Sequence, residues 1–185
     1  MWGDIMLLKD ICLLITKGTT PSTIGYKFQN DGINFIKVEC INENGEIITN
    51  KLEHISHDCY LKMKRSQLFE NDVLITIAGA LGRTIVVNKN ILPANINQAI
   101  AILRPNQNIV NSRYLHYYLS TDKMSKIING YNAQSAQPNI NLTQLGELEI
   151  DIKTQEKQNH IVNIIYFVLI FLLLFFPILY FLRIK

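Results

Sequence analysis

The amino-acid sequence lacks the motifs that mark the common classes of enzyme. It has no Gly-x-Ser-x-Gly nucleophile motif and no phosphate loop ending in Gly-Lys-Ser/Thr. None of its four histidines stands beside an obvious nucleophile, which gives little support for acyl transfer. Glu147 and Glu149 fall at strand spacing on one face, where solvated carboxylates are expected rather than a catalytic pair. These absences predict a binding module that has no catalytic activity and needs no cofactor.

Cysteine is scarce, and its spacing excludes the usual disulfide and zinc frameworks. Cys12, Cys40 and Cys59 are an odd number without a Cys-x-x-Cys pair. His54 and His57 lie close to Cys59 in sequence, but a zinc site needs a fourth ligand and a second ligand pair, so no metal is expected. The N-terminal sequence "MWGDIMLLKD" carries two aspartates where a signal peptide needs an apolar core. We therefore expect free thiols and a reducing, cytoplasmic location.

A strong excess of positive charge is also missing. The formal net charge is +3, and because Arg183 and Lys185 belong to the C-terminal tail, the rest of the chain is close to neutral. A protein that coats nucleic acid by charge alone needs a strongly basic face. A specific binder with a few clustered basic residues stays compatible with this balance.

Most of the C-terminal tail lacks charge. Residues 163–182 contain no Asp, Glu, Lys or Arg, whereas the preceding residues have the mixed composition of a soluble domain. We therefore divide the chain into a domain at residues 1–160 and an apolar helix at 161–185. A helix of about 20 apolar residues is roughly 30 Å long, enough to cross the hydrocarbon core of a bilayer.

Within the domain, strand patterns come first and the clearest helix comes late. The segments 73–78 and 83–87 predict two strands joined by a tight turn at "GALG", and "NQAIAILRP" predicts a further strand ending at Pro105. Apolar residues at helical spacing predict one helix over 112–129, stopped by Gly130. "LTQLGELEIDI" predicts a short helical turn and then a strand. This order indicates an α+β domain with a mixed β-sheet and a late helix, followed by a C-terminal helix.

Several segments, in order, resemble the target-recognition domain of the specificity subunits of type I restriction-modification systems. "KGTTP" is similar to the family's Gly-x-Thr-Pro loop, and "GINFIKVECI" to the strand that follows it. "LFENDVLITIAGALGR" resembles a Gly-Asp-x-Leu … Gly-x-x-Gly stretch, with Asn71 where glycine is usual. "NINQAIAILRP", "RYLHYYLST" and "AQPNINLTQLGELEIDIKTQEKQNHIV" resemble later elements of the domain. Each motif alone is weak, but six in the correct order are specific.

The resemblance implies a non-catalytic subunit that reads one half of a bipartite target in double-stranded DNA. Its partners in such systems are modification subunits, which methylate adenine using S-adenosylmethionine, and a translocating nuclease subunit for restriction. A second half-subunit would be a further partner, provided that the spacer helix following the domain is intact. The rival interpretation is a tail-anchored membrane protein whose cytoplasmic head binds a protein partner.

DNA contacts of this kind need Lys or Arg for phosphates and polar side chains for base edges. Lys62, Lys64 and Arg65 form the only tight basic cluster, for which a solvated charge run is the alternative. Arg83 follows the "GALG" turn and is a candidate to reach a groove. The candidates for base-edge contacts lie in polar loops: Thr19, Thr20, Asn132 and Gln134.

Three interpretations of the apolar tail are open. The first is a transmembrane segment, which the length of the tail favours. Membrane helices tolerate a proline such as Pro177, and Tyr166 and Tyr180 lie near the ends of the tail, where membrane proteins carry aromatic residues. Its Phe-, Leu- and Ile-rich composition favours a truncated or frameshifted spacer helix, because AT-rich DNA read out of frame yields such residues. The third interpretation is a helix that a partner covers on all sides. The membrane is a partner only under the first.

Overall fold

The computed structural model describes residues 3–131 and 139–182, and the strands within these residues form three small sheets. Strands β1 (Asp4–Leu7) and β9 (Glu149–Ile152) pair antiparallel. The central sheet has the order β2-β8-β5-β6 and is antiparallel, with β2 (Cys12–Lys17), β5 (Val73–Thr76), β6 (Thr84–Val86) and β8 (Ile100–Pro105). In the third sheet, β3 (Ile33–Ile36) lies between antiparallel β4 (Glu53–Ile55) and parallel β7 (Ala94–Ile96). The predicted α+β class with mixed sheets is confirmed.

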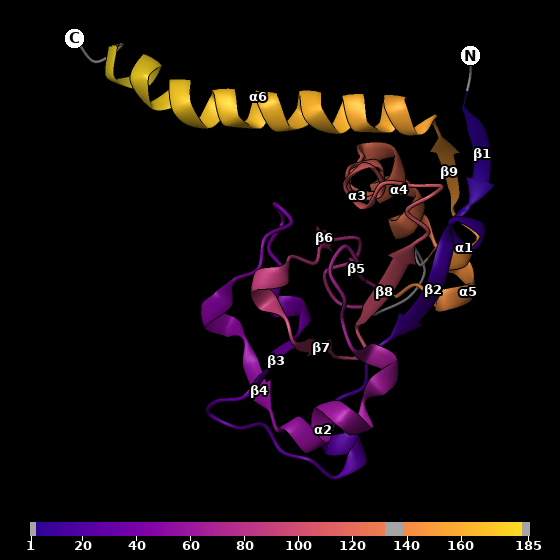
Figure 1. Cartoon of the computed structure of the whole chain (residues 1–185), viewed down its shortest axis with the longest axis vertical. Coiled ribbons are helices and arrows are strands. Elements are labelled where there is room, and N and C mark those ends of the chain that lie inside the picture. The colour runs from indigo at the N-terminus through magenta and orange to yellow at the C-terminus, as the bar shows by residue number, and fades with distance from the viewer. Residues whose placement is uncertain (1–2, 132–138, 183–185) are drawn as a thin grey trace.

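Helices cover one side of the central sheet and one end of the domain. They are α1 (Leu8–Ile11), α2 (His57–Lys62), α3 (Ser112–Leu119), α4 (Asp122–Gly130), α5 (Leu142–Gly146) and α6 (Gln155–Leu182). Short 3-10 turns join them to the strands: η1 (Pro21–Ile24), η2 (Val38–Cys40), η3 (Thr49–Lys51), η4 (Lys64–Ser66) and η5 (Lys89–Ile91). Figure 1 shows α6 lying across the domain next to α3 and α4, with its C-terminal half projecting beyond them.

The two inner strands of the central sheet, β5 and β8, are buried on both faces, which explains their apolar sequences. Side chains of β5 alternate between two cores, with Val73 and Ile75 in the core beneath the helices and Leu74 in the core toward β3 and β7. β8 alternates in the same way, with Leu103 in the first core and Ile102 in the second. A strand covered on both faces needs no polar residue at alternate positions.

The hairpin of β5 and β6 confirms the predicted turn at "GALG". Gly79 and Gly82 adopt φ angles of 75° and 78°, which residues with a Cβ rarely adopt. Asn71, just before β5, also has a positive φ of 70°. Asparagine tolerates this left-handed conformation better than most residues, so the chain keeps the geometry that glycine would provide there.

The prediction of one helix over residues 112–129 is wrong, because the segment forms two helices. α3 ends at Leu119, and Thr121 then caps a new helix by accepting a hydrogen bond from the Met124 amide through its hydroxyl. Asn111 caps α3 in the same manner. The apolar spacing continues across the break because Leu115 and Leu119 of α3 and Ile128 of α4 all face the same core. Periodicity alone could not reveal the second cap.

The helix α6 is fixed to the domain near its N-terminus. Gln158 is fully buried; its amide nitrogen donates to the carbonyls of Ile109 (2.9 Å) and Lys153 (2.8 Å), and its oxygen accepts from the Asn111 amide (2.8 Å). Val162 is buried one turn later. Because α6 begins at Gln155, the division predicted between residues 160 and 161 falls inside a continuous helix.

Candidate nucleic-acid interface

The predicted basic cluster lies on the surface, on a compact turn. Lys62 is the last residue of α2, and Lys64 and Arg65 belong to η4. All three side chains are exposed. No carboxylate in the described part of the chain forms an ion pair with them. Their charges are therefore available for an external anion.

Buried polar contacts fix the backbone beneath this cluster. Asn95 of β7 is fully buried, and its amide nitrogen donates to the Met63 carbonyl (3.1 Å) and to the Ser66 hydroxyl (3.0 Å). The side-chain amide of Gln67 donates to the Tyr60 carbonyl in α2 (2.9 Å). These bonds hold η4 against β7 and α2, so that Lys64 and Arg65 project from a fixed turn.

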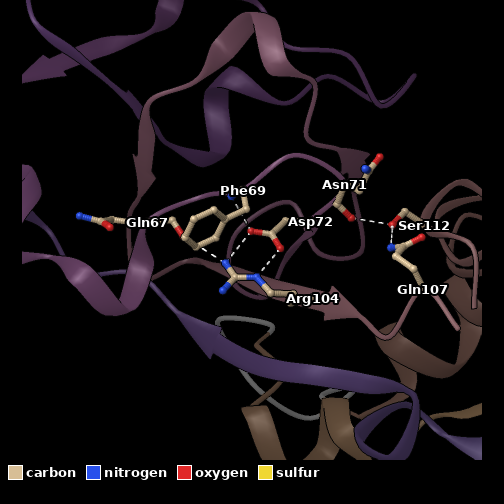
Figure 2. A network of polar contacts seen from close by, with 7 residues as sticks. All are labelled: Gln67, Phe69, Asn71, Asp72, Arg104, Gln107 and Ser112. Carbon is tan, nitrogen blue, oxygen red and sulfur yellow. Dashed lines mark hydrogen bonds and ion pairs between the residues drawn. The ribbon is translucent and has the colours of Figure 1, made fainter. Parts of the chain in front are cut away.

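A buried ion pair adds a further anchor from the central sheet (Figure 2). Arg104 of β8 donates from two nitrogens to the two carboxylate oxygens of Asp72, both at 2.8 Å, and Asp72 is only 1% exposed. A nitrogen of the same guanidinium donates to the Gln67 carbonyl (3.3 Å), directly after η4. The ring of Phe69 lies over the guanidinium, 4.2 Å from its carbon. The pair therefore links the sheet to the segment that carries the basic cluster.

The fold brings one predicted loop residue to the cluster. Thr19, Lys62 and Arg65 line a single pocket of about 170 Å³, together with Ile24 of η1 and the buried residues Met63 and Ser66. The pocket combines two cations with the Thr19 hydroxyl, donors that phosphate oxygens accept from, whereas the Ser66 hydroxyl already donates to the Met63 carbonyl. Residues more than 40 positions apart in the sequence thus converge on one pocket.

The other predicted contacts lie elsewhere. Thr20 is adjacent to the pocket, but its hydroxyl bonds to the side-chain oxygen of Gln98. Arg83 does not join the cluster, because its guanidinium donates to the Ile41 carbonyl (2.9 Å) and to the Glu43 carboxylate (3.1 Å). Asn132 and Gln134 lie outside the described residues. Gln98 and Ile24 were not predicted, because their positions depend on loop packing.

The residues considered for zinc are not arranged as ligands. Cys59 is buried and its sulfur contacts the Met63 sulfur, while His54 is half-buried and His57 is exposed. Within residues 3–131 and 139–182, no group of three His, Cys, Asp or Glu side chains is placed to hold a metal ion. The three cysteines are free thiols, as predicted.

A second cavity, of about 590 Å³, lies beside Arg83 and beneath α6, and the half-buried side chain of His116 lines it. The Nδ1 atom of His116 lies 2.8 Å from the Thr84 hydroxyl, which lies 2.8 Å from the Ser120 hydroxyl. Burial, and then the charge of Arg113, lowers the pKa of His116 to about 4 from the ordinary 6.5. The imidazole is therefore neutral in the folded protein at physiological pH, and it is a structural hydrogen-bonding group.

This lowered pKa predicts an acid-sensitive fold. Between about pH 4 and pH 6.5 the unfolded chain binds a proton at His116 that the folded chain does not, so the free energy of unfolding falls as pH falls through this window. Above pH 6.5 the contribution is fully present. Urea unfolding at neutral pH and at about pH 4.5 measures how much the free energy of unfolding falls on acidification. In His116→Asn this fall should be smaller by about 2–3 kcal/mol. His160→Asn, at an exposed position on α6, should leave the loss unchanged; equal behaviour of the two variants would contradict the assignment.

Relatives of the chain come from one family of proteins. A family model described as the type I restriction modification DNA specificity domain matches residues 3–168. The type I restriction enzyme EcoBI specificity subunit of Escherichia coli is 36% identical over 133 residues, which cover 72% of this chain and 28% of that subunit. The chain therefore spans little more than a quarter of the length of this curated relative.

Solved structures show the same fold at lower identity. A chain from a type I restriction-modification system matches with a TM-score of 0.67 and 21% identity, covering 89% of this chain and 37% of that one. The HsdS subunit from Thermoanaerobacter tengcongensis matches with a TM-score of 0.68 and 13% identity, over 89% and 41% of the two chains. The family resemblance of the sequence motifs is thus confirmed. Because the family model covers most of its length, this chain belongs to the type I restriction-modification DNA specificity domain family.

Proposed function

We propose that this domain recognises a specific sequence in double-stranded DNA within a type I restriction-modification complex, and that it performs no catalysis itself. The observation that carries the proposal is the convergence of Thr19, Lys62 and Arg65 at one pocket, in a chain of this family. The rival interpretation, a tail-anchored protein whose head binds a protein partner, has no support among the relatives.

In this proposal the cations position the domain on the DNA backbone, and the polar loop residues read the base sequence. Lys62, Lys64 and Arg65 contact phosphates, because they are exposed and unpaired on a turn with a fixed backbone. Thr19 lies at the same pocket and contacts a base edge in this proposal. Asn132 and Gln134 remain proposed base contacts. For Arg83, contact with DNA requires exchange of its bond to Glu43, an 85% exposed carboxylate that releases it at low cost.

The proposed partners supply the chemistry. Modification subunits methylate adenine with S-adenosylmethionine, and a nuclease subunit acts in restriction. The specificity domain sets where on the DNA these subunits act. A second half-subunit is a further proposed partner, since a bipartite target needs two readers.

The test is removal of two of the cations. Lys64→Ala combined with Arg65→Ala should weaken DNA binding by about 10-fold to 100-fold and reduce the slope of log affinity against log salt by about 1.8, which is about 0.9 for each lost phosphate contact. Sequence preference should stay the same, because phosphates carry no sequence information. The measurement is a salt titration of binding to DNA selected from a random pool by the unaltered protein.

The matched control removes the same charge from another surface. Lys123→Ala with Lys126→Ala takes two exposed lysines from α4. This variant should bind with the unaltered affinity and slope. If both double variants lose the same amount, net charge explains binding; if neither changes, the cluster is a solvated charge run and its assigned role is wrong.

A further inference from the structure

The largest exposed feature that DNA recognition does not use is the apolar surface of α6. Its large hydrophobic side chains at 164 and 166–175 are exposed by between 37% for Ile170 and 76% for Leu173. The most apolar 18 residues within Gln155–Phe175 have a mean hydropathy of 1.9, and only 11% of them are buried. The sequence continues to residue 182 without a charged residue. Water is a poor solvent for a surface of this kind.

The distribution of apolar side chains around α6 indicates what covers it. From Ile164 to Phe175 exposed apolar residues follow one another around the helix, and the sequence to residue 182 has no charged residue, so there is no charged face to leave in water. A second helix packed against α6 would cover one stripe and leave the rest exposed. A helix lying in a membrane interface also needs a polar face. Hydrocarbon that surrounds the helix covers every side at once.

Length and flanking charges agree with a bilayer. The run 163–182 makes a helix of roughly 30 Å, which matches the thickness of a hydrocarbon core. Glu156 and Lys157 precede the run, and Arg183 and Lys185 follow it. Charges at both ends and none between them fit two polar boundaries. We propose that α6 from Asn163 onward inserts into a lipid bilayer and tethers the specificity domain to a membrane surface.

The contacts of α6 define where the tether begins. Gln158 and Val162 hold its first two turns on the domain, and these contacts stay in place. Ile165 and Leu169 line the cavity opposite Glu43 and Arg83, charged groups that a hydrocarbon core excludes. Because Gln158 and Val162 stay in place, insertion requires α6 to bend after Val162. Ile165 and Leu169 then leave Glu43 and Arg83, Tyr166 leaves Arg113, and water fills the cavity.

Flotation with vesicles tests the proposal on the full chain. The protein is synthesised in a cell-free system containing vesicles of phosphatidylethanolamine and phosphatidylglycerol, then centrifuged in a density gradient. Most of the unaltered protein should float with the vesicles and resist extraction at alkaline pH. Ile170→Lys with Leu173→Lys, in the middle of the run, should lose flotation at least tenfold. Leu13→Lys, at a 70% exposed leucine in β2, should float like the unaltered protein.

DNA binding of the same variants separates this proposal from the function proposed above. The α6 variant should bind selected DNA normally in solution, which also shows that it folds. The proposal is overturned if the unaltered protein does not float and stays in solution as a monomer or as a dimer of its own chain. It is also overturned if the protein sediments equally with and without vesicles, or if the lysine variant floats as well as the unaltered protein.

Discussion

Replacing Arg104 by leucine is expected to lower the free energy of unfolding by about 3–5 kcal/mol, because it leaves the carboxylate of Asp72 buried without its counter-charge. Asp72 is 1% exposed and takes two 2.8 Å hydrogen bonds from the guanidinium. Among the described residues, only the Phe69 amide would still donate to this carboxylate, at 2.8 Å. For a chain of this length the loss corresponds to a fall in melting temperature of roughly 10 °C, measurable by circular dichroism.

Two further variants separate the buried charge from the general loss of a side chain. Adding Asp72→Asn to Arg104→Leu should recover much of the stability, since a neutral amide still accepts from the Phe69 amide and costs less to bury. Lys9→Leu removes an ion pair with Glu147 in which both side chains are about half exposed, and it should cost less than about 1 kcal/mol. Equal costs for Arg104→Leu and Lys9→Leu would refute the buried-charge argument.

The same substitution connects stability to DNA recognition. Arg104 also donates to the Gln67 carbonyl, one residue after the turn that carries Lys64 and Arg65. With that bond lost, Asn95 and Gln67 still hold the turn through their own side chains. We therefore expect the effect of Arg104→Leu on DNA affinity, in folded protein, to be smaller than that of removing the two cations.

The parts of the fold that depend on neighbours in sequence were predictable. The β5–β6 hairpin follows from two apolar runs separated by glycines that adopt positive φ, and β8 ends at Pro105 as expected. The short helix and strand after residue 141 also follow from local pattern. The break between α3 and α4 was missed, since Thr121 acts as a cap only because the helices turn over one core.

The candidate site was predictable in composition but not in geometry. The sequence places Lys62, Lys64 and Arg65 together, whereas their approach to Thr19 depends on contacts made far along the chain. Arg83 looked available in sequence, but its partner Glu43 lies 40 positions away. Gln158 is a polar residue at the start of an apolar helix, and its burial could not be foreseen without Ile109 and Asn111 beside it. Long-range pairing of this kind leaves no local pattern.

The loop that carries Thr19 depends on the absence of a side chain at Gly18. A Cβ built on Gly18 would lie 1.9 Å from the Ile96 carbonyl oxygen and 2.5 Å from the Asn97 oxygen, both of them backbone atoms that cannot move aside independently. The Gly18 amide donates to the Ile100 carbonyl at 3.4 Å, so the loop is also joined to the start of β8. This close approach holds Thr19 at the basic pocket and Thr20 against Gln98.

Gly18→Ala should therefore destabilise the domain by about 3 kcal/mol, the upper end of the cost of overpacking, and weaken DNA binding by displacing the loop. Gly130→Ala is the matched control, because a Cβ at this last residue of α4 meets nothing within 4 Å and should be neutral or stabilise the helix by about 0.5–1 kcal/mol. Urea unfolding gives the stability of both variants, and DNA binding is then measured where each is folded. A Gly18→Ala protein as stable as the control would mean that the loop can move from Ile96 without cost, and that Thr19 is not held at the pocket by this contact.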